Sequence, residues 1–274
     1  MPITKILQLS DTHIVDEGMV AYGVVDTALH LERAVRYIVD ILPKIGPIDG
    51  MIITGDLTDH GTQKAYERFQ SILSPLKMPI FVLPGNHDHR ETLRATLSKH
   101  DYLPEEGPLN FRCRIGNLDV LALDSLDEGK SYGRLAPETL KWLSEELDRL
   151  KGEPVLIAIH HPPFDCGIAH MDAIKLQDPD AFLSVVSEHQ AARLIICGHV
   201  HRFIYRQTAP SPMVIAPSPA HSVALDHRPD GASEFFMEPG GFLLHSFDSE
   251  TASFTSEYVP VGPFEGPHPF FGGE

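Results

Sequence analysis

The amino-acid sequence predicts an α/β protein in which helices and strands are arranged in layers. Short apolar runs alternate with amphipathic segments through most of the 274 residues, which is typical of strands joined by helices. After about residue 203 the pattern changes to short strand-like segments separated by Pro and Gly, which indicates an added antiparallel region. Polar clusters rich in Asp and His follow five of the apolar runs, and the functional prediction depends on them.

Six apolar runs are expected to form strands: KILQL (5–9), GMIIT (50–54), PIFVL (79–83), LDVLAL (118–123), PVLIAI (154–159) and RLIIC (193–197). Helices are expected between them at 28–42, 64–76, 90–99, 137–150 and 181–189. In the fourth helix, leucines recur at steps of three and four residues, and Pro137 suits a first helical turn. The short strands expected in the last third are YRQTAP (205–210), MVIAPS (213–218), GFLLHSFDS (241–249) and ASFTSEYVP (252–260).

Composition and charge exclude several classes of partner. A formal net charge of −16 argues against a nucleic-acid polymer, because phosphate backbones are bound mainly through clustered Lys and Arg. A compact anion could still bind where a metal ion supplies local positive charge. No run approaches the roughly 20 apolar residues that span a bilayer, and the N-terminus lacks a signal-peptide pattern. With three isolated cysteines, these features predict a cytoplasmic protein that does not bind membranes.

Five apolar runs lead directly into side chains that can bind metal. The clusters are SDTH (10–13), GDLTD (55–59), PGNHD (84–88), HHPP (160–163) and GHVH (198–201). Open α/β sheets place their ligand crevice at the carboxyl ends of the strands, so these clusters are expected to converge. Each cluster alone could instead be a helix cap, a turn or a strand terminator. Their common position after strands favours a metal site.

The clusters supply a mixed oxygen and nitrogen ligand set without thiolates, which suits iron, manganese, zinc or cobalt. The candidate metal ligands are Asp11, His13, Asp56, Asn86, His160, His199 and His201. Seven ligands are too many for one tetrahedral ion. Two divalent metal ions that share one carboxylate would use all seven and match the two-metal arrangement that serves displacement at phosphorus.

The motif order DxH, GDxxxxG, GNHD, HHPP and GHxH resembles the calcineurin-like metallophosphoesterases from about residue 5 to about residue 221. The segments YGVVD (22–26), GRLAPETLKWLSEEL (133–147) and MD (171–172) are similar to the bacterial class III cyclic-nucleotide phosphodiesterases and related glycerophosphodiesterases. The resemblance implies a four-layer α/β/β/α sandwich with a C-terminal antiparallel strand region. Residues 1–205 would be the catalytic core, and residues 206–274 would complete the second sheet and part of the substrate or oligomer region, within one domain overall. A homo-oligomer, a dimer or larger, is also implied.

The resemblance also implies how the seven ligands are divided. One ion is assigned Asp11, His13 and His201, the other is assigned Asn86, His160 and His199, and Asp56 bridges them. The second ion has a neutral amide and only the shared carboxylate, so it is expected to bind more weakly. His161 is expected to support the site without binding metal, although a ligand role stays open. Three further carboxylates could orient ligand histidines or serve as caps and turns: Asp59, Asp88 and Asp124.

The implied function is hydrolysis of small phosphodiesters, either 3′,5′-cyclic nucleotides or glycerophosphodiesters, by a metal-bound hydroxide. His87 is the candidate catalytic residue, stabilising phosphoryl oxygens or protonating the leaving alkoxide. Substrate contacts are expected from Asn86, His87 and His221. The alternatives without a functional role are a packed loop histidine for His87 and an exposed turn histidine for His221. The alternative functions are a phosphomonoesterase of the same superfamily and a metal-binding scaffold without turnover.

Overall fold

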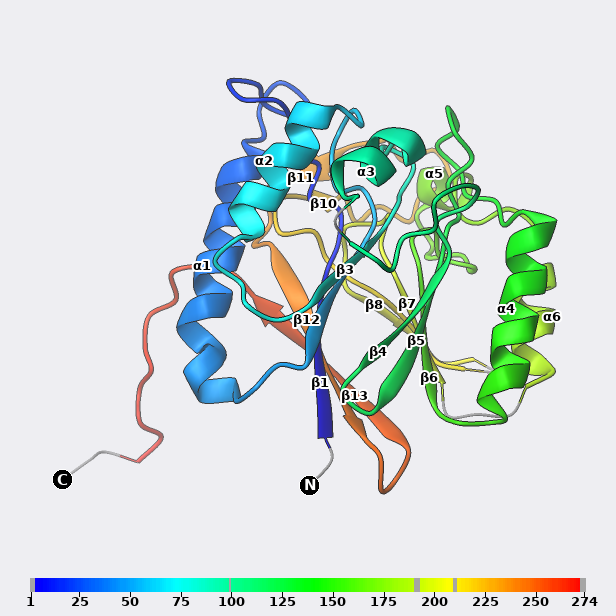
Figure 1. The fold of residues 1–274 in the computed structure, drawn as a ribbon. Coiled ribbons are helices and arrows are strands. Elements are labelled where there is room, and N and C mark those ends of the chain that lie inside the picture. The colour runs from blue at the N-terminus through cyan, green and yellow to red at the C-terminus, as the bar shows by residue number, and fades with distance from the viewer. Residues whose placement is uncertain (1–2, 99, 190–192, 209–210, 272–274) are drawn as a thin grey trace.

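Two β-sheets packed face to face form the centre of the molecule (Figure 1). The computed structural model describes residues 3–98, 100–189, 193–208 and 211–271. The first sheet has the strand order β13 (Ser253–Pro260), β12 (Gly241–Asp248), β1 (Ile3–Leu9), β2 (Gly50–Thr54) and β3 (Ile80–Leu83). The second has the order β4 (Phe111–Ile115), β5 (Leu118–Leu123), β6 (Val155–Ile159), β7 (Arg193–Cys197), β9 (Met213–Ile215) and β8 (Ile204–Arg206).

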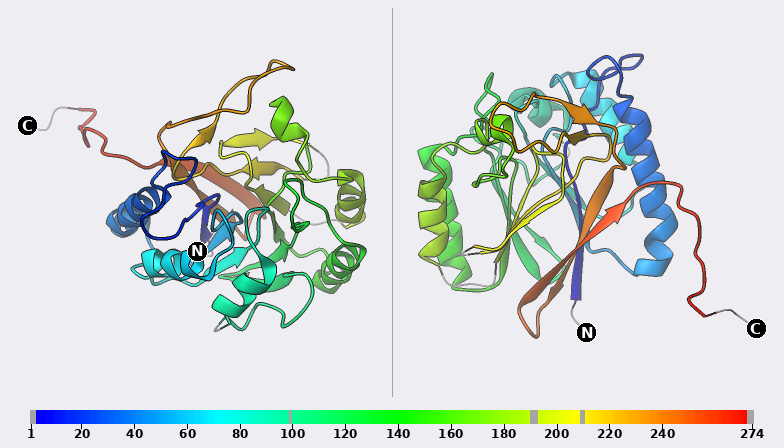
Figure 2. Two further views of the ribbon diagram at one scale, coloured as in Figure 1. Left: turned by 90° about the horizontal axis from the view of Figure 1, so that it is seen from above. Right: turned by 180° about the vertical axis from the view of Figure 1, so that it is seen from behind.

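Helices cover the outer faces of both sheets, as Figures 1 and 2 show. The first sheet is covered by α1 (Thr27–Ile45), α2 (Gln63–Leu73) and α3 (Arg90–Thr96). The second is covered by α4 (Pro137–Leu150) and α6 (Pro179–Ser187), with the short α5 (Ala169–Asp172) near its edge. The predicted four-layer α/β/β/α sandwich is therefore confirmed. Within the described residues, no helix is both long and apolar enough to cross a membrane.

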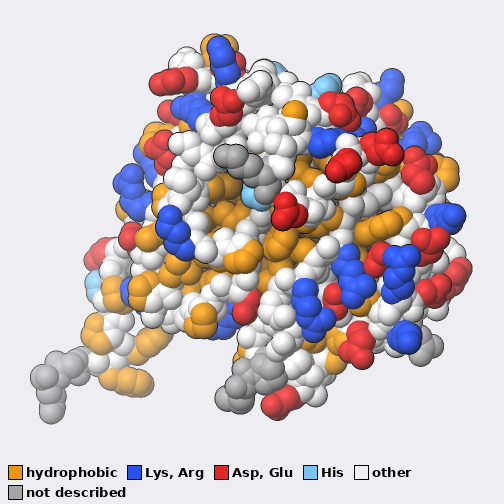
Figure 3. Space-filling model, viewed as in Figure 1, with side chains coloured by type: hydrophobic (Ala, Val, Ile, Leu, Met, Phe, Trp, Pro, Cys, Tyr) orange, Lys and Arg blue, Asp and Glu red, His pale blue; other side chains and the backbone are white. Residues whose placement is uncertain are grey.

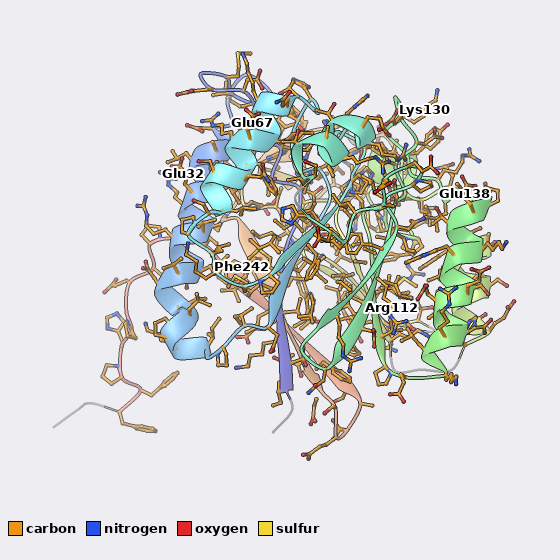
Figure 4. The ribbon with its side chains drawn as sticks, in the orientation of Figure 1. Glu32, Glu67, Arg112, Lys130, Glu138 and Phe242 are labelled. Atoms are coloured by element: carbon orange, nitrogen blue, oxygen red, sulfur yellow. The ribbon has the colours of Figure 1, made fainter. Side chains whose placement is uncertain are left out.

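Three apolar layers hold the sandwich together, one between the sheets and one under each set of helices. Strand β12 shows how alternation serves two of them. Phe242 faces α1, where its ring centroid lies 6.5 Å from that of Tyr37 (Figure 4), and Leu243 points into the layer between the sheets. The acidic side chains of Glu32 and Glu67 project from the outer faces of α1 and α2 (Figure 4).

The predicted elements are recovered with small boundary shifts. The helix expected at 64–76 ends at Leu73, because Pro75 has no backbone N–H to continue the helical hydrogen bonds beyond Ser74. The helix expected at 90–99 ends at Thr96, and Lys99 lies outside the described residues, as do Ala209 and Pro210 of the expected strand YRQTAP. Strand β4 was not predicted because it has no continuous apolar run. Its arginines alternate with apolar residues, as in an edge strand with one face toward solvent.

The C-terminal strands differ from expectation in their placement. We expected residues 206–274 to complete the second sheet, and β9 lies there, but β12 and β13 extend the first sheet instead. Strand β12 pairs antiparallel with β1 from Ile3↔Asp248 to Gln8↔Leu243. Strand β1 is paired with β2 on its other edge, so β12 supplies the backbone partners that a buried strand needs on both sides. A further two-stranded ribbon joins β10 (Ser222–Val223) to β11 (Phe235–Phe236).

An apolar cleft of about 410 Å³ opens beside β3, α2 and the chain after α3. Its walls include Phe69, Leu73, Phe81 and Tyr102, and the apolar side chains on this face are visible in Figure 3. None of the seven predicted metal ligands lines this cleft. The chemistry expected from the sequence therefore lies elsewhere, at the carboxyl ends of the parallel strands.

Candidate metal centre

The loops that follow β1, β2, β3, β6 and β7 meet at one end of the sandwich, the upper edge in Figure 1. Backbone hydrogen bonds connect them: Asp11 N–H donates to the carbonyl of Gly55 (3.0 Å), and His13 N–H donates to that of Asp56 (2.9 Å). Within the second sheet, Gly198 N–H donates to the carbonyl of His160 (3.0 Å), and between the sheets His199 N–H donates to Asp11 Oδ1 (2.9 Å). Residues separated by nearly two hundred positions thus come together, as the sequence predicted.

The first group consists of four buried residues whose potential ligand atoms all lie within 4.8 Å of one another: Asp11, His13, Asp56 and His201. His13 Nε2 lies 3.1 Å from His201 Nε2 and 3.5 Å from Asp56 Oδ2, and His201 Nε2 lies 3.4 Å from Asp11 Oδ1. Ligands bound at about 2.1 Å in a tetrahedron lie about 3.4 Å apart. The spacing of these atoms therefore fits a single ion.

The second group surrounds His160. Its Nε2 lies 3.3 Å from Asp56 Oδ2 and 3.3 Å from Asn86 Oδ1. A ring nitrogen of His199 lies within 4.8 Å of a ring nitrogen of His160. One atom, Asp56 Oδ2, is therefore close to His13 in the first group and to His160 in the second. A single carboxylate oxygen between two groups of ligands is the arrangement that a bridged pair of ions requires.

Other side chains and carbonyls fix the orientation of the ligand histidines. Asp59 Oδ1 accepts a hydrogen bond from His13 Nδ1 (3.0 Å), and the carbonyl of Thr54 accepts one from His160 Nδ1 (2.7 Å). Each contact places the ring proton on Nδ1 and leaves the Nε2 lone pair facing the site, which is how metal-binding histidines are oriented.

Two of the three further carboxylates named from the sequence support the site loops. Asp59 contacts His13 as described, and Asp88 accepts backbone hydrogen bonds from Leu57 (3.1 Å) and Gly85 (2.9 Å), which fixes the GD loop to the GNHD loop. The third, Asp124, binds Arg90 Nε (2.7 Å) and stabilises a loop.

The site is built on strained backbone. Five of the seven residues have left-handed φ angles: Asp11 (54°), His13 (44°), Asp56 (49°), His199 (74°) and His201 (57°). Such conformations cost roughly 1–3 kcal/mol for a non-glycine residue, and they persist where the surroundings impose them, most often at functional sites. Neighbouring glycines are required for close approach, since a Cβ at Gly85 would lie 2.2 Å from Asp56 Oδ1 and one at Gly198 2.0 Å from Ser10 Oγ.

Burial and the charges of neighbouring residues shift the pKa values of these groups in different directions. Burial, together with His160, lowers the pKa of His199 to about 3, and burial next to His221 holds the pKa of His201 well below its usual range. Burial opposes a proton on His160 too, but Asp56 outweighs it and raises the pKa of His160 to about 9. Burial raises the pKa of Asp11 to about 6. The site therefore combines neutral imidazoles at His199 and His201, which have free lone pairs, with an Asp56 carboxylate that attracts positive charge.

His161 lies directly behind the second group. Its Nδ1 is 2.8 Å from Ser125 Oγ, and its ring centroid is 4.7 Å from that of His160 and 4.6 Å from that of His199. The ring packs so closely on Gly133 that a Cβ there would lie 2.3 Å from it. A ring nitrogen of His161 also falls within 4.8 Å of those of His160 and His199. This geometry accommodates either a supporting role or a ligand role.

His87 and His221 both face the first group. The His87 backbone N–H donates to Asp56 Oδ1 (2.8 Å), its Nδ1 donates to the Asp59 carbonyl (3.0 Å), and one-third of its side chain is exposed. His221 is buried, with its ring centroid 4.5 Å from that of His201, and its Nδ1 has no hydrogen-bond partner among the described residues. Both imidazoles can therefore reach a ligand bound next to the first group.

Two aromatic residues at the site were not predicted. The Tyr22 ring lies 5.2 Å from that of His221 and 5.5 Å from that of Phe235 on β11. Tyr22 is half-exposed and has a left-handed φ of 51°, in a tight turn closed by Ala21 and Val25. The sequence segment 22–26 offered only a resemblance, because a Tyr-Gly turn carries no sign of what its ring will contact.

The donor set fits two divalent metal ions, because its oxygens and neutral nitrogens have the spacing of coordinated ligands and share one carboxylate oxygen. Comparison with known proteins agrees with this class of site. The family model described as calcineurin-like phosphoesterase matches residues 4–203. The chain belongs to this family.

Individual relatives place the chain more narrowly. It is 37% identical over 267 residues to a probable glycerophosphodiester phosphodiesterase GpdQ of Arcobacter nitrofigilis, covering 97% of this chain and 96% of that protein. It is 30% identical over 233 residues to the 3′,5′-cyclic adenosine monophosphate phosphodiesterase CpdA of Pseudomonas aeruginosa, covering 85% and 80%. A dimetal phosphatase from Danio rerio shares the fold, with a TM-score of 0.63 at 13% identity, covering 96% of this chain and 100% of that one.

Proposed function

We propose that this chain is a dinuclear metal-dependent phosphodiesterase that hydrolyses small phosphodiesters. The observation that carries the proposal is the position of Asp56 Oδ2, 3.5 Å from His13 Nε2 and 3.3 Å from His160 Nε2. The names of the relatives support two substrate classes, glycerophosphodiesters and 3′,5′-cyclic nucleotides. The higher identity and fuller coverage of the first relative favour glycerophosphodiesters.

The proposed division of the ligands between the two ions is the one that the family resemblance implies. Asp11, His13 and His201 hold one ion, Asn86, His160 and His199 hold the other, and Asp56 bridges. Iron, manganese, zinc or cobalt would suit these ligands. When bound, such ions neutralise phosphoryl oxygens and lower the pKa of water enough to supply hydroxide near neutral pH.

The protein's own groups would position the substrate and handle the proton. His87 is held by Asp56 and by the Asp59 carbonyl, with part of its ring open to solvent. From there it can stabilise the phosphoryl oxygens or protonate the leaving alkoxide. His221, fixed against His201, and the Asn86 amide complete the proposed substrate contacts.

The remaining assignments concern partners and location. The net charge of −16 supports a small-molecule substrate and speaks against a nucleic-acid polymer. We propose a cytoplasmic homo-oligomer, with residues 1–205 as the catalytic core and residues 206–274 shaping the substrate and oligomer region. The ribbon formed by β10 and β11 supports the latter, because it brings Phe235 to the site.

Metal analysis combined with turnover tests the proposal. Purified protein should bind two equivalents of Mn²⁺ and hydrolyse glycerophosphoethanolamine, cyclic AMP or bis-p-nitrophenyl phosphate faster than p-nitrophenyl phosphate. Asp56→Ala should lose both ions. Faster turnover of the monoester would instead identify a phosphomonoesterase, and two bound ions without turnover of any ester would identify a binding scaffold.

A further inference from the structure

We infer that Gln8 is a positioning residue that fixes three ligand-bearing strand ends relative to one another. Its side chain, on β1, is fully buried in the layer between the two sheets. Most of that layer is formed by apolar residues, with Ile6 and Leu243 among the neighbours of Gln8 in sequence and in register. An amide in such surroundings costs free energy unless all of its hydrogen bonds are made. The inference rests on the proposed dinuclear function.

Every polar atom of the Gln8 side chain is bonded. Gln8 Nε2 donates to Thr54 Oγ1 (2.9 Å) at the end of β2 and to the carbonyl of Cys197 (2.9 Å) at the end of β7. Gln8 Oε1 lies 2.9 Å from His245 Nε2 on β12 and accepts its proton. One side chain therefore connects strands of the first sheet to a strand of the second.

The partners of Gln8 lead directly to the metal ligands. The Thr54 carbonyl accepts the hydrogen bond from His160 Nδ1 (2.7 Å), and Thr54 Oγ1 lies 2.8 Å from the Oγ of Ser10, which precedes Asp11. Cys197 is followed by Gly198 and His199. The network thus reaches one ligand of the first ion and two ligands of the second.

His245 determines which way the Gln8 amide points. Its Nδ1 lies 2.8 Å from Ser256 Oγ on β13 and accepts the serine hydroxyl proton, so the single ring proton of His245 is on Nε2 and faces Gln8 Oε1. Burial keeps the ring neutral, so this tautomer persists. Without that N–H, the amide could turn over and present its oxygen to the Cys197 carbonyl, where two acceptors would repel each other.

A purely stabilising role would not need an amide. Apolar side chains fill most of this layer, and their contacts are non-directional, so they tolerate small shifts of one sheet against the other. Metal ligands have to be held within about 0.5 Å of their working geometry. A fully satisfied amide at the strand ends supplies the directional contacts that apolar packing lacks.

Four variants test this inference. Gln8→Met keeps the side-chain volume and removes the hydrogen bonds, and Leu243→Met is an apolar control in the same layer. His245→Phe removes the N–H that Gln8 accepts, and His245→Gln can restore an N–H there. The readouts are Mn²⁺ affinity by calorimetry and the visible spectrum of the Co²⁺-loaded protein, with folding checked by circular dichroism. Gln8→Met should bind the more weakly held ion about 10- to 100-fold less tightly. His245→Phe should shift the same affinity and the Co²⁺ spectrum, whereas His245→Gln and Leu243→Met should match the wild type.

The outcomes separate this inference from the proposed function. Wild-type affinity for both ions in folded Gln8→Met, or equal losses in His245→Phe and His245→Gln, would overturn the positioning role. If Gln8→Met does not fold, the His245 pair decides. If the wild-type protein itself binds fewer than two ions, the dinuclear function fails before any variant is compared.

Discussion

Replacing Asp59 with Asn should weaken the binding of one metal ion and leave the affinity for the other almost unchanged. The buried Asp59 carboxylate accepts the His13 Nδ1 proton at 3.0 Å, and it touches none of the ligands assigned only to the second ion. A hydrogen bond to a charged group contributes about 1.5–3 kcal/mol, and each 1.4 kcal/mol is a factor of ten in affinity. The affinity for the ion held by His13 should therefore fall by about 10- to 100-fold.

Calorimetric titration with Mn²⁺ measures both affinities in the same experiment. His60→Ala is the matched control, because His60 Nε2 contacts the other Asp59 oxygen at 3.3 Å but the His60 side chain is three-quarters exposed. That variant should bind both ions as the wild type does, since exposed ion pairs contribute little. The reasoning that assigns His13 and Asp59 to one ion would be refuted if Asp59→Asn lowered the affinity for both ions equally or for neither.

Three further predictions follow from the same geometry. His87→Ala should lower kcat by about 10²- to 10⁴-fold while metal content measured by mass spectrometry stays unchanged, and unaltered turnover would remove His87 from the mechanism. The ion held through the neutral Asn86 amide should bind more weakly than the ion held by Asp11, and equal affinities in a titration would contradict this division of ligands. In EDTA, the melting temperature should be highest near pH 6.5. Above that pH, stabilisation is lost as His160 gives up its proton, because the pKa of His160 in the folded protein is raised to about 9. Below that pH, stabilisation is lost because buried imidazoles with lowered pKa values, such as His199 and His245 at about 3, take up protons more readily in the unfolded chain. Differential scanning fluorimetry from pH 4 to 9 checks this, and a melting temperature that rises steadily with pH would be contradictory.

The layered fold could be predicted because its central parallel strands are largely apolar. Strands such as β2 and β6 are buried on both faces, so the sequence has no alternation there and the runs GMIIT and VLIAI stand out. Strand β4 is the opposite case, because the exposed Arg112 and Arg114 interrupt the apolar run by which the other strands are recognised. The partners of β12 could not be predicted, because an apolar strand of eight residues fits an open edge in either sheet.

The convergence of the candidate ligands could be predicted for a different reason. Parallel strands align their carboxyl ends, so Asp11 had to lie near Asp56 in one sheet, and His160 near His199 in the other, once the strands were recognised. The face-to-face packing of the two sheets brings these pairs together. Apart from Asp59, sequence spacing could not identify the residues that orient these ligands. Gln8 and His245 are 237 positions apart, and nothing local distinguishes either from an ordinary polar residue on a strand. Tyr22 was missed likewise, because its neighbours are set by loop geometry.

Anomalous diffraction from crystals soaked in Mn²⁺ tests the central claim most directly. Two peaks about 3.5–4 Å apart should appear at the carboxyl ends of β1, β2, β6 and β7, with one Asp56 oxygen within about 2.2 Å of both. A single peak, or two peaks of which only one is bound by Asp56, would contradict the shared carboxylate on which the proposed function depends.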